Sequence, residues 1–243
     1  MRTLNLGILF FIMALAACTS SEQRKEVDYS CLVNPFIGTD FTGNTYPGAQ
    51  FPFGMVQLSP DNGLPGWDRI AGYYYPDSTI AGFSHTHLSG TGAGDLYDIS
   101  FMPVTVPYKE ADAPLGIYSR FSHKNEKAFA GYYQVWLEDY NINVELTATP
   151  RCGIQRYTFP AAESAIFLNL SKAMNWDETL DSYVEVVDSM TLRGYRYSNG
   201  WARNQKIYFY TTISKPFKSI QMDTVAISKE GHRIGTGYVV RLD

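Results

Sequence analysis

The chain has 243 residues, a formal net charge of −4, 18% charged residues and 15% aromatic residues. This composition excludes a disordered chain and a nucleic-acid-binding protein, because the first has few aromatics and the second needs clustered positive charge. The chain contains 18 tyrosines, 14 phenylalanines and four tryptophans. Such a surplus of flat rings is typical of exported proteins that bind carbohydrate, since a ring can cover the apolar face of a sugar.

The amino-terminal segment predicts export. Residues 1–17 combine a basic head with an apolar run that has no acidic residue. A membrane-spanning helix needs ~20 apolar residues, so this shorter run indicates a signal peptide. Its end, "LAACTS", resembles a bacterial lipoprotein signal in which Cys18 becomes lipidated. We therefore expect a protein anchored to the bacterial envelope by lipid only, in the periplasm or on the outer-membrane surface. Ordinary cleavage, which would leave Cys18 as a plain thiol, is the alternative.

A polar tether is predicted over residues 18–31, and short extended segments follow it. Glycines and prolines between residues 33 and 59 break any helix. Alternation and turn signals then predict strands throughout the rest of the chain. The predicted strands cover 53–60, 71–77, 79–88, 97–108, 131–137, 142–149, 153–159, 165–171, 183–198, 206–217, 224–228 and 235–242.

The strand pattern predicts an all-β fold. We expect an antiparallel β-sandwich over residues 32–243, with few or no helices beyond the signal peptide. The exception is one short helix around residues 124–130. The last nine residues, "GTGYVVRLD", stop within a predicted strand. A natural last strand and a truncated chain would both end in this way.

Two cysteines remain after Cys18. In an oxidising compartment Cys31 and Cys152 could form one disulfide. Two separate thiols fit the sequence equally well, because spacing alone does not decide pairing.

Two loops each carry a tryptophan beside a glycine. In "GWDR", Trp67 could stack on a sugar ring while Asp68 accepts hydrogen bonds from hydroxyls. The alternative is that Trp67 plugs the core. The loop "SNGWARNQ" repeats this design with Trp201. The two loops could line one rim, or they could be unrelated.

The segment "GFSHTHLSGTGAGDLYDISFMP" contains two of the four histidines. His85 and His87 are two residues apart, so on a strand both would point to the same face. Such a pair can form half of a zinc site, but no third ligand is evident. Alternatively, one or both histidines bond the glycine-rich turn that follows. Asp95 and Asp98 come next, and a paired-carboxylate role would need a separation that sequence does not give.

These blocks together resemble a known family. The motifs "VNPFIGT", "PGAQFPFGMVQLSPD", "GYYYPDSTIAGFSHTHLSGTGAGDLYDISFMP" and "ELTATPRCGIQRYTFP" are similar to the amino-terminal domain of glycoside hydrolase family 92, exported bacterial exo-acting α-mannosidases. The resemblance covers nearly all of residues 33–243. It implies a galactose-mutarotase-like β-sandwich followed by an (α/α)₆ barrel, which the sequence would lack.

The resemblance also carries functional expectations. It implies a calcium-dependent, inverting enzyme that acts on mannose-rich glycans and whose general acid, general base and most calcium ligands lie in the missing barrel. No catalytic or metal-binding residue is therefore assigned here. The sandwich would shape one wall of the sugar site, with Trp67, Asp68, His85, His87 and Trp201 as substrate-binding residues. Alone it is expected to be inactive. The alternative is a free-standing surface lipoprotein that binds carbohydrate.

Overall fold

The computed structural model describes residues 27–109, 116–171, 177–227 and 233–242. By its internal contacts the chain divides into two units, Met1–Cys31 and Leu32–Asp243. The predicted signal peptide, including Cys18, lies outside the described residues. Cys31 and Cys152 are both free and exposed, so the structure contains no disulfide between them.

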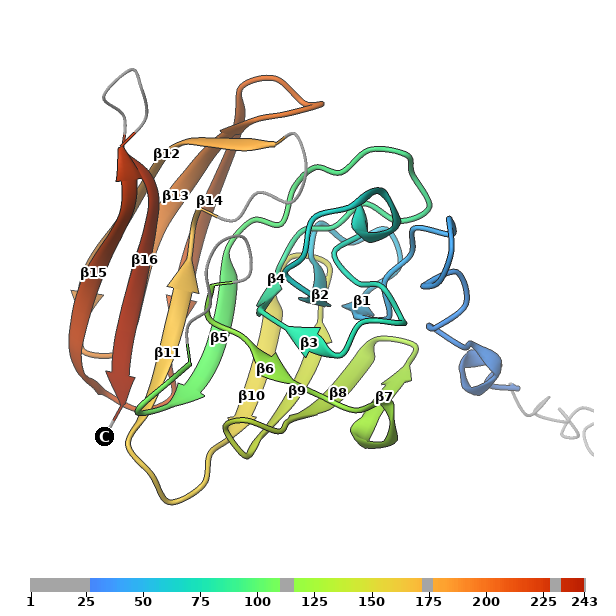
Figure 1. Ribbon diagram of the computed structural model, residues 1–243, viewed down its shortest axis with the longest axis horizontal. Helices are drawn as coiled ribbons and strands as arrows, with labels where there is room; N and C mark the ends of the chain where they lie inside the picture. The colour runs from blue at the N-terminus through green and yellow to red at the C-terminus, as the bar shows by residue number, and fades with distance from the viewer. Residues whose placement is uncertain (1–26, 110–115, 172–176, 228–232, 243) are drawn as a thin grey trace, which may run out of the picture. The chain divides into compact units, whose positions relative to one another are not determined.

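The second unit is built from antiparallel sheets. The largest has seven strands in the order β1-β2-β4-β5-β11-β16-β15, and Figure 1 shows β5, β11, β16 and β15 side by side. A four-stranded sheet has the order β10-β9-β8-β7, a three-stranded sheet the order β12-β13-β14, and β3 pairs with β6. Among the described residues the helical turns are the short 3₁₀ segments Ser30–Leu32, Trp67–Arg69 and His123–Asn125. The predicted antiparallel β-sandwich is confirmed.

The strands have the following bounds. They are β1 (Ala49–Gln50), β2 (Gln57–Asp61), β3 (Thr79–Ile80), β4 (Gly82–Ser84), β5 (Ser100–Thr105), β6 (Ser119–Arg120), β7 (Glu126–Phe129), β8 (Tyr132–Leu137), β9 (Ile142–Ala148), β10 (Gly153–Thr158), β11 (Ser164–Asn169), β12 (Glu178–Asp188), β13 (Thr191–Asn199), β14 (Gln205–Thr212), β15 (Phe217–Ile227) and β16 (Arg233–Leu242).

The seven-stranded sheet is apolar on both faces. Along β5, Met102 packs into a cluster that includes the buried residues of β8 and β9, whereas its neighbour Phe101 packs into a second cluster with Leu192 of β13. Because alternate residues of a strand point to opposite faces, the large sheet has the four-stranded sheet on one face and the three-stranded sheet on the other. Figure 1 shows β12, β13 and β14 behind the red and yellow strands.

Two predicted elements are wrong. Residues 124–130 form no helix: a 3₁₀ turn is followed by β7, which pairs with β8 around Gly131, a glycine with φ of 76°. Pairing of the hairpin overrides the local helix preference of "KNEKAFA". Residues 71–77 form no strand. Gly72 has φ of 87°, and a Cβ there would stand 2.6 Å from Asp61 Oδ1, so the chain turns at this point.

Candidate functional site

Trp67 lies at the surface, on a short turn. It begins the 3₁₀ segment Trp67–Arg69 and is 55% exposed. The turn is fixed by Arg69, whose Nε and Nη2 lie 2.6 and 2.5 Å from the two carboxylate oxygens of Asp77. Asp68 is half-buried on the same turn. Trp67 is therefore not a core plug, because more than half of its side chain is exposed to solvent.

The glycine-rich segment, residues 88–98, lies against this indole. A Cβ at Gly92 would stand 3.7 Å from two carbons of the six-membered ring of Trp67. A methyl group at this position would just touch the ring, so Gly92 lies next to Trp67. The small residues of this segment thus form one border of the Trp67 surface.

The second tryptophan loop is bonded to the same segment. The Ala202 N–H donates to Asp95 Oδ2 at 3.0 Å. Gly200 approaches Asp95 so closely that a Cβ would stand 2.7 Å from Oδ1. Between them Trp201 is 77% exposed. The glycine-rich segment therefore connects the two tryptophan loops, which lie far apart in the sequence.

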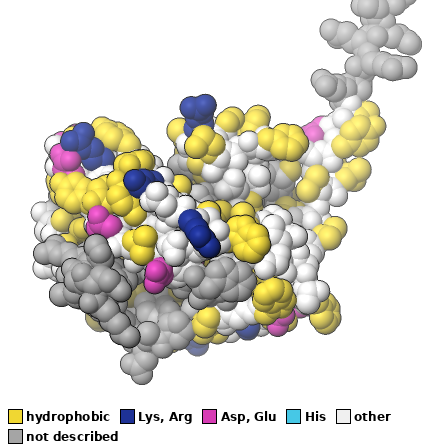
Figure 2. Space-filling view, turned by 90° about the horizontal axis from the view of Figure 1, so that it is seen from above, with side chains coloured by type: hydrophobic (Ala, Val, Ile, Leu, Met, Phe, Trp, Pro, Cys, Tyr) yellow, Lys and Arg dark blue, Asp and Glu magenta, His cyan; other side chains and the backbone are white. Residues whose placement is uncertain are grey.

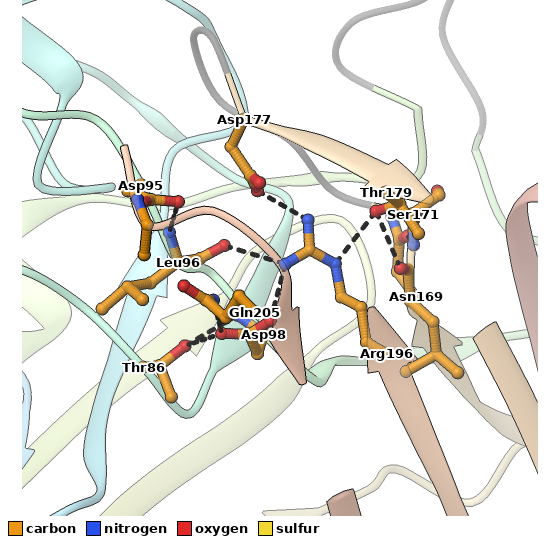
Figure 3. A network of polar contacts seen from close by, with 12 residues as sticks. Thr86, Asp95, Leu96, Asp98, Asn169, Ser171, Asp177, Thr179, Arg196 and Gln205 are labelled. Atoms are coloured by element: carbon orange, nitrogen blue, oxygen red, sulfur yellow. Dashed lines mark hydrogen bonds and ion pairs between the residues drawn. The ribbon is translucent and has the colours of Figure 1, made fainter. Parts of the chain in front are cut away.

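A buried arginine fixes the segment to the three-stranded sheet (Figure 3). Arg196 of β13 donates from Nη1 to Asp98 Oδ1 and from Nη2 to Asp177 Oδ2, both at 2.6 Å, and all three side chains are fully buried. Burial lowers the pKa of Arg196, but the two carboxylates outweigh it and raise that pKa above its usual value. The guanidinium therefore stays charged inside the protein.

Of the two carboxylates that bind Arg196, Asp177 has fewer hydrogen bonds than Asp98. Burial raises its pKa to about 6 against the opposing effect of Arg196, and the charges of Asp95 and Asp98 add to the rise. Its Oδ1 is buried without a hydrogen-bond partner in the described residues. By contrast, Asp98 Oδ2 accepts from Thr86 and Gln205 at 2.7 and 3.2 Å. The raised pKa favours the protonated form of Asp177 at pH values below about 6.

The structure does not support a histidine pair on the sugar-binding surface. β4 ends at Ser84, so His85 and His87 lie beyond the strand and their rings make different contacts. His87 is 3% exposed, and its ring nitrogens bond Gln57 O at 2.7 Å and Asp61 Oδ1 at 2.9 Å. The predicted same-face pair is wrong, and His87 has a structural role.

His85 is held by packing as well. Its Nδ1 lies 2.7 Å from Ile99 O, and a Cβ at Gly153 would stand 2.8 Å from its ring. Burial lowers the pKa of His85, which favours the neutral ring at neutral pH. The ring nitrogens of both histidines bond groups outside the glycine-rich segment, whereas the alternative expectation placed such bonds on the glycine-rich turn. The backbone N–H of His85 does donate to that segment, to Asp98 O at 3.0 Å.

The described residues do not fit a metal site. They contain no group of three or more histidine, cysteine, aspartate or glutamate side chains placed to hold an ion. Calcium takes 6–8 oxygen ligands. The carboxylates of Asp98 and Asp177 lie near each other, but both of them bind the Arg196 guanidinium. Asp95 and Asp98 are likewise engaged with backbone and arginine donors, so they do not form a free catalytic pair.

Arg196 and Asp177 were missed by sequence analysis. One signal was present: in the alternating strand 191–199, Arg196 occupies an inward position in phase with the buried Leu192 and Ser198. An inward arginine needs buried carboxylates. Which carboxylates these are could not be predicted, because Asp98 and Asp177 are 98 and 19 residues away.

Hydrophobic side chains also gather at several other places on the surface. Figure 2 shows them in separate groups, with basic and acidic side chains beside the group at the left of the view.

Among the described residues, no helix is long and apolar enough to cross a bilayer.

Comparison with known proteins relates the fold to a family. Residues 32–241 match the model of the glycosyl hydrolase family 92 N-terminal domain. The family GH92 alpha-mannosidase BT3965 of Bacteroides thetaiotaomicron is 34% identical, with a TM-score of 0.80 over 88% of this chain and 31% of that one. The GH92 inverting mannosidase BT2199 of the same organism is 25% identical, with a TM-score of 0.71 over 90% and 30%.

A curated relative matches a smaller part of the chain. It is an uncharacterized secreted glycosidase of Arthroderma benhamiae, 29% identical over 163 residues, which are 65% of this chain and 20% of the relative. The chain therefore spans between a fifth and a third of the length of these three relatives.

Proposed function

Because the chain belongs to glycosyl hydrolase family 92 and carries its amino-terminal domain, we propose that it is the substrate-shaping part of an α-mannosidase. The proposal extends to an exported, calcium-dependent, inverting enzyme that acts on mannose-rich glycans. In support, one similar structure is a GH92 alpha-mannosidase in complex with mannoimidazole and another is a GH92 inverting mannosidase.

The observation that carries the proposal is the joining of two exposed tryptophans by one segment. Gly92 lies next to Trp67, and Trp201 lies between Gly200, which closely approaches Asp95, and Ala202, which donates to it. A flat ring covers the apolar face of a sugar, and a carboxylate such as Asp68 accepts from its hydroxyls. Few polar groups beside aromatic walls are the usual composition of a small-ligand site.

The catalytic carboxylates are proposed to come from a following domain. An inverting glycosidase needs two carboxyl groups ~6.5–9.5 Å apart with room for a water molecule. Here Asp95 accepts from backbone N–H groups, while Asp98 and Asp177 bind Arg196. These three carboxylates therefore bond groups of the protein itself and stabilise the fold. We propose that the domain alone does not hydrolyse mannosides.

Calcium is proposed to bind outside the described residues for the same reason. The mannosidase relatives are about three times as long as this chain, which leaves room for a domain with oxygen ligands. In this arrangement the amino-terminal domain positions the sugar.

Export and anchoring are the remaining part of the proposal. The curated relative is a secreted glycosidase, and the signal peptide with Cys18 predicts a lipid anchor. Expression in a bacterial host with a radiolabelled fatty acid tests this. The wild-type protein should be labelled and sediment with membranes, and Cys18→Ala should be unlabelled. A labelled Cys18→Ala variant would contradict the lipid anchor.

The enzymatic part is tested by comparing two proteins on an α-mannoside. The full-length gene product should release mannose, lose activity in a chelator and regain it with calcium. The 243-residue chain should release none. Turnover by the chain alone would contradict the proposed division of labour. A gene that encodes no further domain, with glycan binding by the chain, would favour the free-standing lipoprotein.

A further inference from the structure

The outer face of the three-stranded sheet carries a regular array of tyrosines. Strand register places Tyr183 opposite Tyr195 and Tyr195 opposite Tyr208, which forms a row of three. A second row contains Asp181, Tyr197 and Lys206, and a third contains Glu185, Arg193 and Tyr210. We call these nine residues the tyrosine face. Residues two apart on a strand share a face, so all nine side chains point away from the core.

The face is open to solvent yet ordered. Tyr208 and Tyr210 are 66% and 68% exposed. Tyr195 stacks on Tyr197 with ring centroids 4.3 Å apart, and the ring of Tyr208 stands edge-on to both. The Tyr197 and Tyr208 hydroxyls lie 3.0 Å apart. Rings held in this way lose little conformational freedom when a ligand binds, which favours affinity.

The charges of the face are balanced. The Arg193 guanidinium binds the Glu185 carboxylate through two bonds of 2.8 and 2.9 Å. Asp181 accepts from the Tyr195 hydroxyl at 3.1 Å, and the Lys206 ammonium lies 5.2 Å from the centroid of the Tyr197 ring. Two cations and two anions leave no net charge. The complementary ligand is therefore neutral, with apolar surface for the rings and hydroxyls for the polar groups.

The face also has room for such a ligand. A shallow hollow of about 400 Å³ is lined by six residues of the face, Tyr183, Glu185, Arg193, Tyr195, Tyr208 and Tyr210, together with Gly194 and Phe209. This volume is within the range of small-molecule sites. The three rows extend over roughly 14 Å, because a strand rises about 3.4 Å per residue. A short chain of sugar rings fits these dimensions better than a single ring.

We propose that the tyrosine face is a second carbohydrate-binding surface, for a neutral oligosaccharide that lies along β13 and β14. The row of Asp181, Tyr197 and Lys206 adjoins the loop that carries Trp201, since that loop joins Asn199 of β13 to Gln205 of β14. A glycan on the face can thus extend toward the Trp67 and Trp201 surface. The ligand class follows from the face itself, whereas the choice of mannan as a probe rests on the proposed function.

Affinity electrophoresis tests this inference. The chain is run in native gels that contain yeast mannan, a neutral β-glucan or heparin. We expect slowed migration in at least one neutral polysaccharide, and at least about tenfold weaker retention of the double variant Tyr208→Ala/Tyr210→Ala, as is usual when aromatic anchors are removed. Tyr208→Phe, which keeps the ring, should retain most of the binding. Phe129→Ala removes an aromatic that is 56% exposed on β7 and should change nothing.

Every other result of the electrophoresis either supports or overturns the proposed binding surface. Retention by glucan alone supports the tyrosine face and separates it from the proposed mannose specificity. Undiminished retention of the double variant, retention by heparin alone, or no retention at all would overturn the inference. Hydroxyl-radical footprinting of the full-length gene product is the second measurement. Tyr208 and Tyr210 should be oxidised without glycan and protected by the polysaccharide that slows migration, and protection without glycan would show that another protein surface covers the face.

Discussion

The Nη1 atom of Arg196 lies 2.6 Å from Oδ1 of Asp98, and neither side chain is exposed to solvent. This bond joins β13 to the glycine-rich segment 98 residues earlier in the chain. Since the same segment lies next to Trp67 and bonds Ala202, we infer that the buried ion pair helps to hold the candidate sugar-binding surface in place.

Removal of this arginine should strongly destabilise the domain. Arg196→Ala leaves Asp98 and Asp177 as buried carboxylates without their cation, which typically costs about 3–5 kcal/mol. Urea unfolding measures the change in free energy. Arg193→Ala is the matched control, because Arg193 is on the same strand but its bond to Glu185 is exposed, and it should change stability far less. Equal losses in the two variants would contradict a special role for Arg196.

The pH dependence of stability should contain a contribution from Asp177. Burial raises its folded-state pKa to about 6, above the ~3.9 expected in the unfolded chain. Between these values the folded state binds the proton more tightly, so stability falls as pH rises from about 4 to 6, by about 1–3 kcal/mol. Asp177→Asn, which does not titrate, should lose this part of the fall. Parallel stability curves of the two proteins from pH 4 to 7 would contradict the assignment.

His87 should matter for folding and not for metal binding. His87→Ala removes hydrogen bonds at both ring nitrogens in a fully buried place, and we expect a loss of about 2–5 kcal/mol. Thermal melts of the wild-type chain should be unchanged by zinc or by a chelator. A zinc-dependent rise in the melting temperature that His87→Ala abolishes would instead indicate a metal site.

The isolated chain should self-associate. Several large apolar side chains are strongly exposed, including Ile37, Phe41, Phe53 and Met55 at 73%, 77%, 103% and 68%. Surfaces rich in such residues usually mark interaction sites. Light scattering over a range of concentrations should show a rising apparent mass. A monomer at every concentration would contradict this expectation.

The strands were predictable because alternation is a local property. The hairpin of β8 and β9 follows from two alternating runs separated by "EDYN", and Asn141 with φ of 54° supplies the turn. The prediction that His85 and His87 share a face was wrong for a related reason. The two-residue rule holds only within a strand, and β4 stops at Ser84, one residue beyond its single pairing with β5, that of Phe83 with Phe101.

The candidate surface was predictable only in part. Glycines beside Trp67 and Trp201 indicated two loops, but spacing alone left open whether each ring is exposed or plugs the core. That both loops meet the glycine-rich segment could not be predicted, since the contacts of Gly92 and Asp95 depend on tertiary packing. The sequence likewise did not show that Asp95 and Asp98 are used to hold this packing together.

The most direct test of the sugar-binding role is the turnover of Trp67→Ala in the full-length gene product. Trp67 is 55% exposed, so the variant should fold, with a melting temperature close to that of the wild type. Phe129 lies on β7 and is 56% exposed, so Phe129→Ala is the matched control. We predict that kcat/KM for an α-mannoside falls at least about tenfold in Trp67→Ala and stays unchanged in Phe129→Ala. A folded Trp67→Ala enzyme with normal kcat/KM would contradict the account.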